Sequence, residues 1–81
     1  MFFYIVRCAD QSLYIGIAQD TNKRIHDHNR GKGANWIKRH GPAKIIYTEK
    51  YNTYLEAYQR EKQVKKWSRK KKENLIKGRR P

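Results

Sequence analysis

Two short apolar runs near the start of the chain have the composition and spacing of β-strands. Phe2 to Arg7 is aromatic and β-branched, and Leu13 to Ala18 has the same character. The residues between them, Ala9-Asp10-Gln11-Ser12, are of the types that favour a turn. The pattern therefore predicts a β-hairpin at the start of the chain.

Beyond the hairpin, the pattern predicts helices around a third strand, which is expected over Lys44 to Lys50. The first expected helix is capped by Asp20 or Thr21 and runs to about Asn29, before Gly31-Lys32-Gly33. A short helix or turn is expected over Ala34 to Arg39, closed by Gly41-Pro42. A long helix capped by Thr53 is expected from about Tyr54 to Lys66, and a last one capped by Ser68 should reach Lys77. The order is β-β-α-(α)-β-α-α. We expect a single domain over residues 1–77 and a basic tail over residues 78–81.

The register of the hairpin decides whether Tyr4 and Tyr14 lie on the same face of the sheet. Opposed residues of an antiparallel pair share a face, so the two tyrosines lie together if Val6 pairs with Tyr14 and Tyr4 pairs with Gly16. This register needs an odd loop or a bulge around residues 8–12. Gly16 would then leave room beside the Tyr4 ring for a substrate backbone. The alternative is a strand irregularity without a role.

The charge of the chain indicates a polyanionic partner. The 81 residues include 20 Lys and Arg but only 7 Asp and Glu, which gives a formal net charge of +13. Nucleic acid is the simplest partner for such an excess, and an anionic membrane surface is the competing interpretation. No apolar run approaches the roughly 20 residues that span a bilayer, and no cleavable signal pattern opens the chain.

The single cysteine, Cys8, excludes an internal disulfide and fits a reducing cytoplasm. Cys8 alternates with Tyr4 and Val6 along the first predicted strand. A small buried apolar side chain is therefore favoured over a reactive thiol, and we expect no disulfide partner.

Polar residues at a regular spacing form a candidate site. Arg24 follows Tyr14 by ten residues, as Tyr14 follows Tyr4, and His28 lies one helical turn after Arg24 on the same helix face. Each has an ordinary alternative: strand aromatics for the tyrosines, a solvated charge for Arg24, and a surface or core histidine for His28. His26 and His28 lack the i, i+4 spacing of a helical metal site, so zinc is not expected there.

Glu61 interrupts the apolar stripe of the long predicted helix. Tyr54, Ala57, Tyr58 and Val64 recur at helical spacing, and Glu61 falls among them. A carboxylate among buried groups is costly unless it is paired or binds a metal ion. A metal ligand and a structural ion pair with a basic neighbour both stay open.

Further basic and aromatic residues indicate a surface for nucleic acid. The runs from Lys62 to Lys66 and from Arg69 to Lys72 have the charge for phosphate contacts. Trp36 and Trp67 interleave with this charge and are able to stack on bases, although core packing is favoured for Trp67. The residues expected to contact nucleic acid are Gly16, Lys32, Trp36, Lys38, Arg39, Lys62, Lys65, Lys66 and Arg69.

Together these residues resemble the GIY-YIG nuclease family, and within it the small stand-alone bacterial members of the YhbQ-like, UPF0213 type. Phe3-Tyr4 stands where the first family motif has Ile-Tyr, and Tyr14-Ile15-Gly16 is the second motif unchanged. The further matches are Arg24 to the family arginine, His28 to a histidine or tyrosine four positions later, Glu61 to the metal-binding glutamate, Asn74 to a downstream asparagine, and residues 28–34 to a segment of the small subgroup.

The resemblance covers nearly the whole chain, with departures at a few positions. Phe2 replaces the glycine of the first motif, a change that the small subgroup tolerates. Ile37 and Lys38 replace an expected hydroxyl residue and an arginine, so nucleic-acid contacts in that loop are not carried over from the family.

The resemblance implies an α+β fold, a small three-stranded antiparallel sheet flanked by helices, with a nuclease site on one sheet face. It implies that Glu61 holds one Mg²⁺ or Mn²⁺ that polarises a DNA phosphate and stabilises the leaving oxygen. The resemblance further implies that Arg24 donates hydrogen bonds to the phosphate and that Tyr14 is the general base for the attacking water. The Tyr4 hydroxyl is expected to position water or phosphate, and His28 to orient Tyr14 or relay its proton. Asn74 is expected to support the site.

Three functions compete for this sequence. The leading one is a metal-dependent DNA endonuclease. The second is a catalytically silent nucleic-acid-binding module, which would not need Glu61. The third is a basic protein that binds anionic membranes, and it is disfavoured because the basic helix carries its aromatic groups on a core-like stripe.

Overall fold

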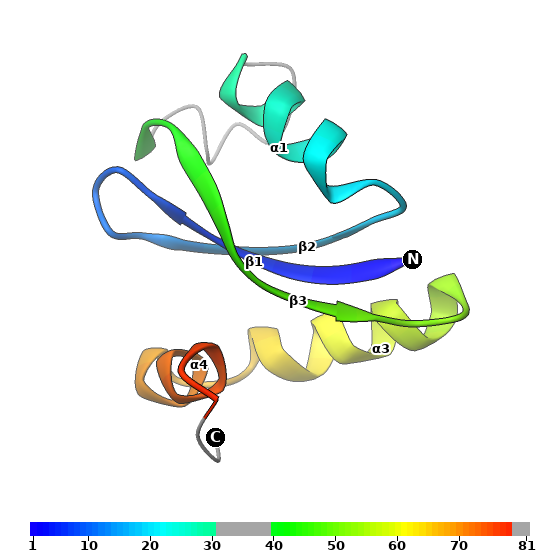
Figure 1. Ribbon diagram of the computed structural model, residues 1–81. Helices are drawn as coiled ribbons and strands as arrows, with labels where there is room; N and C mark the ends of the chain where they lie inside the picture. The colour runs from blue at the N-terminus through cyan, green and yellow to red at the C-terminus, as the bar shows by residue number, and fades with distance from the viewer. Residues whose placement is uncertain (31–39, 79–81) are drawn as a thin grey trace.

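Three antiparallel strands form a sheet in the order β2-β1-β3, with helices on both faces (Figure 1). The computed structural model describes residues 1–30 and 40–78. Its elements are β1 (Phe2–Cys8), β2 (Leu13–Ala18), α1 (Thr21–Asn29), β3 (Ala43–Lys50), α3 (Tyr54–Lys65) and α4 (Arg69–Ile76). The expected α+β fold with a three-stranded antiparallel sheet is confirmed. The short helix or turn expected over residues 34–39 lies outside the described residues.

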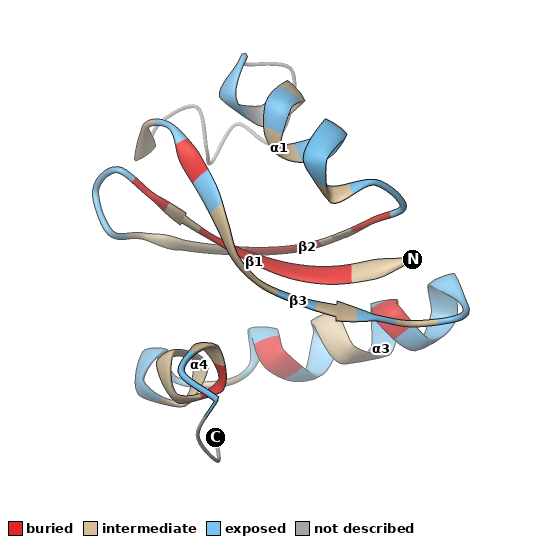
Figure 2. Cartoon of the chain, in the orientation of Figure 1, coloured by how far each residue is buried: buried red, intermediate tan, exposed pale blue. Residues whose placement is uncertain are grey.

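The central strand β1 supplies the core on both faces of the sheet, and Figure 2 shows it as a nearly continuous buried ribbon. Phe3 and Ile5 face α3 and α4, where Val64 and Leu75 join them in one apolar cluster. Tyr4, Val6 and Cys8 face α1 in a second cluster, whose further members are Ala18, Ala43, Tyr14, Ile25 and Ile45. A strand covered on both faces needs apolar side chains at successive positions, and this explains the unbroken run in the sequence.

The hairpin adopts the register that brings both tyrosines to one face. Val6 pairs with Tyr14 and Tyr4 pairs with Gly16. The chain turns through the three residues between Cys8 and Ser12, and the N–H of Cys8 donates to the Ser12 carbonyl at 2.9 Å. The last loop residue, Gln11, has a φ of 72°, as a three-residue loop with a bulge requires. The prediction of an odd loop is therefore confirmed.

Side-chain caps begin each helix where the sequence predicts them. Asp20 caps α1, because its carboxylate accepts from the backbone N–H of Lys23 at 3.1 Å. Thr53 caps α3 through the N–H of Glu56, and Ser68 caps α4 through the N–H of Lys71. The observed boundaries differ from the expected ones by no more than a residue or two, as frayed helix ends allow.

The apolar stripe predicted for α3 is wrong in part. Ala57 and Val64 are fully buried, but Tyr54 is 59% exposed and Tyr58 is 38% exposed. The two rings stack on each other, with centroids 5.9 Å apart and planes 10° from parallel. Their spacing of four residues lets them pack along the outside of the helix instead of in the core.

Candidate active site

Tyr4 is the most buried polar side chain of the candidate site. It lies in the middle of β1 with 2% of its surface exposed. Burial raises its pKa to about 12, the negative charges of Tyr14 and Glu61 add to this rise, and the positive charge of Arg24 opposes it. The Tyr4 hydroxyl is therefore protonated at neutral pH and is able to donate a hydrogen bond.

The environment of Tyr4 shows that four of the expected site residues lie near one another. Tyr14, Arg24 and Glu61 all influence the pKa of its hydroxyl, although these residues come from β2, α1 and α3. The hairpin register brings Tyr14 to the same sheet face as Tyr4. Arg24 lies in the first turn of α1, which is stabilised by the side-chain cap of Asp20.

Gly16 lets the Tyr4 ring lie over the neighbouring strand. A Cβ built at Gly16 would stand 2.5 Å from the Tyr4 hydroxyl oxygen and 2.7 Å from the ring carbon that bears it. Both distances are shorter than real Cβ contacts, so no side chain fits at Gly16 while Tyr4 keeps this place. The space at Gly16 is therefore filled by the Tyr4 ring, and the expectation that it leaves room for a substrate backbone is wrong. The alternative of a strand irregularity without a role does not account for this contact either.

Glu61 approaches the site from the helix layer opposite α1. Helix α3 packs through Val64 against the Phe3 face of the sheet, whereas Tyr4 belongs to the α1 face. The expectation of a site wholly on one sheet face therefore needs correction. The Tyr4 ring lies over β2, the edge strand, and α3 contacts both β1 and β2, so the Glu61 charge acts on Tyr4 at this edge.

The surroundings of Glu61 leave its carboxylate within reach of solvent. Its side chain is 15% exposed, and Lys65, one turn later, places its ammonium nitrogen 3.5 Å from the carboxylate. Lys65 is itself 57% exposed, and ion pairs of such lysines contribute little to stability. The pair is compatible with either a structural or a ligand role for Glu61.

A polar network beside Glu61 fixes the rotation of α3 against β3. Arg60 donates two hydrogen bonds to the carboxylate of Glu49, at 2.9 and 3.1 Å. The hydroxyls of Tyr47 and Tyr51 also donate to Glu49. Burial alone would raise the pKa of Glu49, but these hydrogen bonds outweigh it and lower the pKa. The sequence pattern gave no sign of this network, because its members come from a strand, a loop and a helix.

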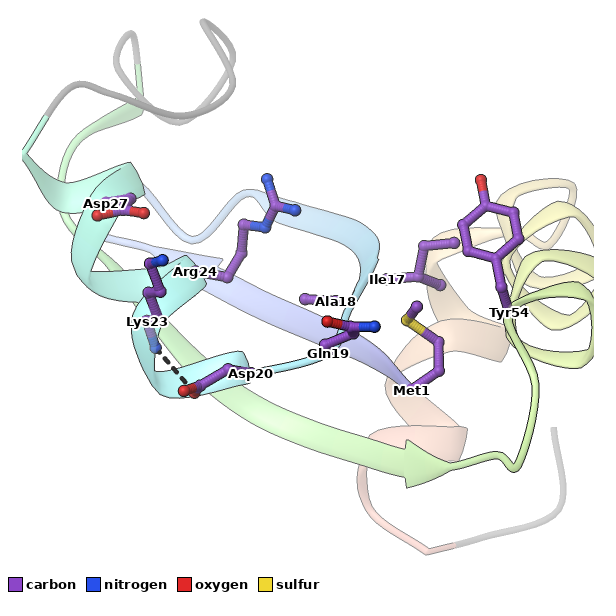
Figure 3. A pocket seen from close by; sticks show the side chains of 9 residues that line it. All are labelled: Met1, Ile17, Ala18, Gln19, Asp20, Lys23, Arg24, Asp27 and Tyr54. Carbon is purple, nitrogen blue, oxygen red and sulfur yellow. Dashed lines mark hydrogen bonds between the residues drawn. The ribbon is translucent and has the colours of Figure 1, made fainter.

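A pocket of about 640 Å³ adjoins the site (Figure 3). It lies where the start of α1 faces the start of α3, with the end of β2 between them. In Figure 3 the side chain of Arg24 extends from α1 on one side, and the ring of Tyr54 rises from α3 on the other. The remaining lining residues are Met1, Ile17, Ala18, Gln19, Asp20, Lys23 and Asp27.

The residues present fit a hard divalent cation that keeps most of its water. No group of three His, Cys, Asp or Glu side chains suited to a metal ion occurs within residues 1–30 and 40–78. Glu61 offers one carboxylate, on a side chain that is 15% exposed, near the Tyr4 hydroxyl. Mg²⁺ is held in this way at many phosphate sites, by one or two carboxylates together with water and substrate oxygens. One carboxylate on a partly exposed side chain would suit a metal ion that is shared with substrate oxygens and water.

Other residues expected at the site or the nucleic-acid surface have varied surroundings. Lys62 and Lys66 are exposed on the outer side of α3, and Asn74 is half-buried on α4. Arg69 donates to the Gln11 carbonyl at 2.6 Å and to Glu73 at 3.3 Å, so it ties α4 to the hairpin loop. Residues Lys32, Trp36, Lys38 and Arg39 lie outside the described residues, as does the side chain of His28.

Trp67 and Cys8 have the packing roles that the sequence favours. Trp67 packs against the Phe3 cluster, with the guanidinium of Arg60 5.2 Å and the ammonium of Lys71 4.5 Å from its ring centroid. These cations occupy ring faces on which a base would stack. Cys8 is a buried free thiol, and burial raises its pKa, which makes it unreactive.

Comparison with known proteins shows that the chain belongs to the GIY-YIG family. Residues 1–74 match the family model of the GIY-YIG catalytic domain. A UPF0213 protein of Staphylococcus aureus is 49% identical over 78 residues, which cover 96% of this chain and 95% of that protein. The solution structure of the UPF0213 protein BH0048 from Bacillus halodurans is similar with a TM-score of 0.61 and 38% identity, over 94% of this chain and 81% of that one. Protein EF2693 from E. faecalis gives a TM-score of 0.64 and 37% identity, over 95% and 82% of the two chains.

Proposed function

Because the chain belongs to the GIY-YIG family, whose domain is that of a nuclease, we propose that it is a metal-dependent endonuclease that hydrolyses phosphodiester bonds in DNA. One observation supports this most directly: Tyr14, Arg24 and Glu61, from three different elements, all lie close enough to the buried hydroxyl of Tyr4 to influence its pKa. A module that only binds nucleic acid has no need of a carboxylate at such a place, because a carboxylate repels phosphate.

The two tyrosines have different parts in the proposed reaction. The raised pKa of Tyr4 keeps its hydroxyl protonated, so it donates to the phosphate or to the attacking water. Tyr14 takes the proton from that water.

Arg24 supplies the positive charge on the protein side. It lines the pocket of about 640 Å³ from α1, where its guanidinium is exposed and able to bind a phosphate entering from solvent. Donors aimed at the phosphate oxygens are strongest on the charge that develops in the transition state. His28, on the same helix, is proposed to orient Tyr14 or to relay its proton.

Glu61 is the proposed protein ligand of one Mg²⁺ or Mn²⁺, and Asn74 is proposed as support. When bound, such an ion polarises the scissile phosphate and stabilises the leaving oxygen. Glu61 keeps its carboxylate at the edge of the sheet because α3 is fixed by the buried residues Ala57 and Val64 and by the pairing of Arg60 with Glu49.

The test is a plasmid-nicking assay with Mg²⁺ and with Mn²⁺ on wild type and on the variant Glu61→Gln. The matched control is Glu56→Gln, the same change on an exposed residue of the same helix, where glutamine retains the capping geometry with Thr53. We expect wild type and Glu56→Gln to nick DNA, and Glu61→Gln to lose nicking while binding DNA as well as wild type or better. The amide is a neutral ligand that binds the cation poorly, and its introduction removes a charge that repels phosphate.

Two outcomes would replace the proposal by an alternative. If Glu61→Gln nicks DNA like wild type, and Lys65→Gln lowers the melting temperature as much as Glu61→Gln does, then Glu61 is a structural ion-pair residue. If wild type binds nucleic acid tightly but cleaves none with either metal, the chain is a silent binding module.

A membrane surface remains the competing partner for the positive charge. No helix within the described residues has both the length and the apolar character that crossing a bilayer requires. We propose nucleic acid as the partner and the cytoplasm as its location, since the only cysteine is a buried free thiol. Sedimentation with liposomes of anionic and neutral lipid tests this, and binding to anionic liposomes that DNA does not displace would contradict it.

A further inference from the structure

An exposed aromatic and basic line runs along the outer side of α3, from the pocket of the candidate active site to a second hollow. Tyr54, Tyr58 and Lys62 succeed one another at intervals of one helical turn, so they lie in a row. Tyr54 lines the pocket that Arg24 also lines. At the other end, Lys62 lines a hollow of about 470 Å³, together with Lys66, Gln59, Gln63 and Trp67. Eight residues of helix span about 12 Å.

The members of this line hold one another in place. The rings of Tyr54 and Tyr58 are stacked, with planes 10° apart, and the ammonium of Lys62 lies 5.5 Å from the Tyr58 ring centroid. Tyr58 thus has a ring on one side and a cation beside it, whereas Tyr54 stands at the end of the row. An exposed tyrosine that is held by a neighbour loses little conformational freedom when a flat ligand stacks on it.

Burial does not explain two such tyrosines. Tyr54 is 59% exposed and Tyr58 is 38% exposed, and neither belongs to the apolar clusters on the two faces of the sheet. Exposed aromatic rings between cations are the arrangement by which proteins bind unpaired bases, since the rings stack on bases while the cations hold the phosphates. Here Arg24 lies across the pocket from Tyr54 at one end of the row, and Lys62 and Lys66 lie at the other end.

We propose that Tyr54 is the stacking surface of a nucleotide subsite on α3, with Tyr58 as its positioning residue and Lys62 as a phosphate contact. The ligand is a strand of nucleic acid with at least one unpaired base, next to the phosphate held by Arg24. This subsite rests on the proposed function and specifies its substrate: a strand with an unpaired, unstacked base beside the point of cleavage. A base-paired strand presents only its edges and phosphates, so it gains the cation contacts but not the stacking.

The experiment measures the affinity of the protein for a fluorescently labelled oligodeoxynucleotide, single-stranded or annealed to its complement. EDTA is present throughout, so the readout is binding without cleavage. The variants are Tyr54→Ala, Tyr58→Ala and Tyr54→Phe. The matched control is Leu55→Ala, because Leu55 is 60% exposed on the same helix but lies beside the row.

We expect Tyr54→Ala to weaken binding of the single strand by about 5- to 100-fold and binding of the duplex by no more than about 2-fold. Tyr54→Phe should restore single-strand binding, because its ring stacks equally well. Tyr58→Ala should have a smaller effect in the same direction, and Leu55→Ala should have none. The subsite is refuted if Tyr54→Ala equals Leu55→Ala on the single strand, or if it weakens the single strand and the duplex equally.

The result separates the subsite from the endonuclease proposal. If the tyrosine variants behave as expected but wild type cleaves nothing with Mg²⁺ or Mn²⁺, the subsite stands and the enzyme does not. If wild type nicks DNA while Tyr54→Ala binds both probes normally, the endonuclease proposal stands and the subsite does not. Circular dichroism of each variant establishes that it is folded, which is expected since both tyrosines are exposed.

Discussion

The Tyr4 ring lies over Gly16 of the paired strand, so closely that a Cβ at Gly16 would stand 2.5 Å from the Tyr4 hydroxyl oxygen. Tyr4 is buried and cannot swing into solvent, because its ring is enclosed between β1, β2 and α1. The missing side chain of one residue therefore sets the position of a hydroxyl on the next strand. This relation links a motif glycine to the chemistry of a tyrosine at a distance of twelve residues in the sequence.

We predict that Gly16→Ala lowers the cleavage rate at least 10-fold and stability by about 1–3 kcal/mol, as overpacking of a core does. The added methyl group must displace the Tyr4 ring or spread the two strands. DNA affinity should fall less than the cleavage rate, since the basic residues of α3 are not involved. Nicking rates, thermal melts and DNA affinities of the variant measure the three effects.

A double-mutant cycle separates the Tyr4 contact from a general effect of the strand. In a Tyr4→Ala background the methyl group at Gly16 meets no ring, so the same substitution should cost much less stability there than in wild type. Equal costs in the two backgrounds would show that Gly16 matters for the strand alone.

The sequence determined those features that depend on local periodicity and turn chemistry. The odd loop of the hairpin followed from the requirement that Tyr4 and Tyr14 share a face, and the caps at Thr53 and Ser68 followed from residue type. The exposed places of Tyr54 and Tyr58 could not be predicted this way. A helical stripe shows which residues share a side of a helix, but its width does not show how much of that side the sheet covers.

The network around Glu49 was equally beyond prediction, for a different reason. Glu49 accepts hydrogen bonds from Tyr47, Tyr51 and Arg60, and only the packing of α3 against β1 and β2 brings Arg60 close to it. In sequence, Arg60 is one of 20 basic residues and nothing distinguishes it. Glu61 was identified because it falls among the apolar positions of its helix, but its approach to Tyr4 from the opposite helix layer needed the structure.

A second prediction concerns the hydroxyl of Tyr4. Tyr4→Phe should lower the cleavage rate about 10- to 100-fold, because one donor to the reacting phosphate or water is lost. The pH–rate profiles of variant and wild type should have the same shape between about pH 6 and pH 10, since burial raises the pKa of Tyr4 to about 12 and it stays protonated throughout. If the Phe variant instead loses an ascending limb that wild type shows, then Tyr4 is the base and our assignment to Tyr14 is wrong.

A third prediction concerns the salt dependence of DNA binding. With a net charge of +13, binding should weaken steeply with salt, by a log–log slope of about −0.9 for each phosphate neutralised on duplex DNA. The double variant Lys62→Gln and Lys66→Gln should make the slope less steep by about 1 to 2. Lys44→Gln, an exposed lysine on β3, is the control and should change it less. If Lys44→Gln changed the salt slope as much per lysine as the double variant does, the overall net charge and not the surface of α3 would account for DNA binding.

The last prediction concerns Glu49, which holds α3 and therefore Glu61 in place. Glu49→Gln should lower stability by about 1–3 kcal/mol at pH 7, because Arg60 keeps its charge with a neutral partner. Both side chains of the pair are about four-fifths buried, with 20% of Arg60 and 19% of Glu49 exposed, so solvent screens the loss only partly.

The pH dependence of this loss has a definite sign. The pKa of Glu49 is lowered from 4.5 in the folded protein, so the unfolded chain binds its proton first as pH falls. The stabilisation is complete above about pH 4.5 and disappears as pH falls through the folded pKa. Urea unfolding at several pH values should therefore show the gap between wild type and Glu49→Gln narrowing in acid. Glu73, whose pKa is also lowered by Arg7, remains in both proteins and contributes the same slope to each. A gap that stays constant from neutral pH into acid would mean that Glu49 acts through packing and not through its charge.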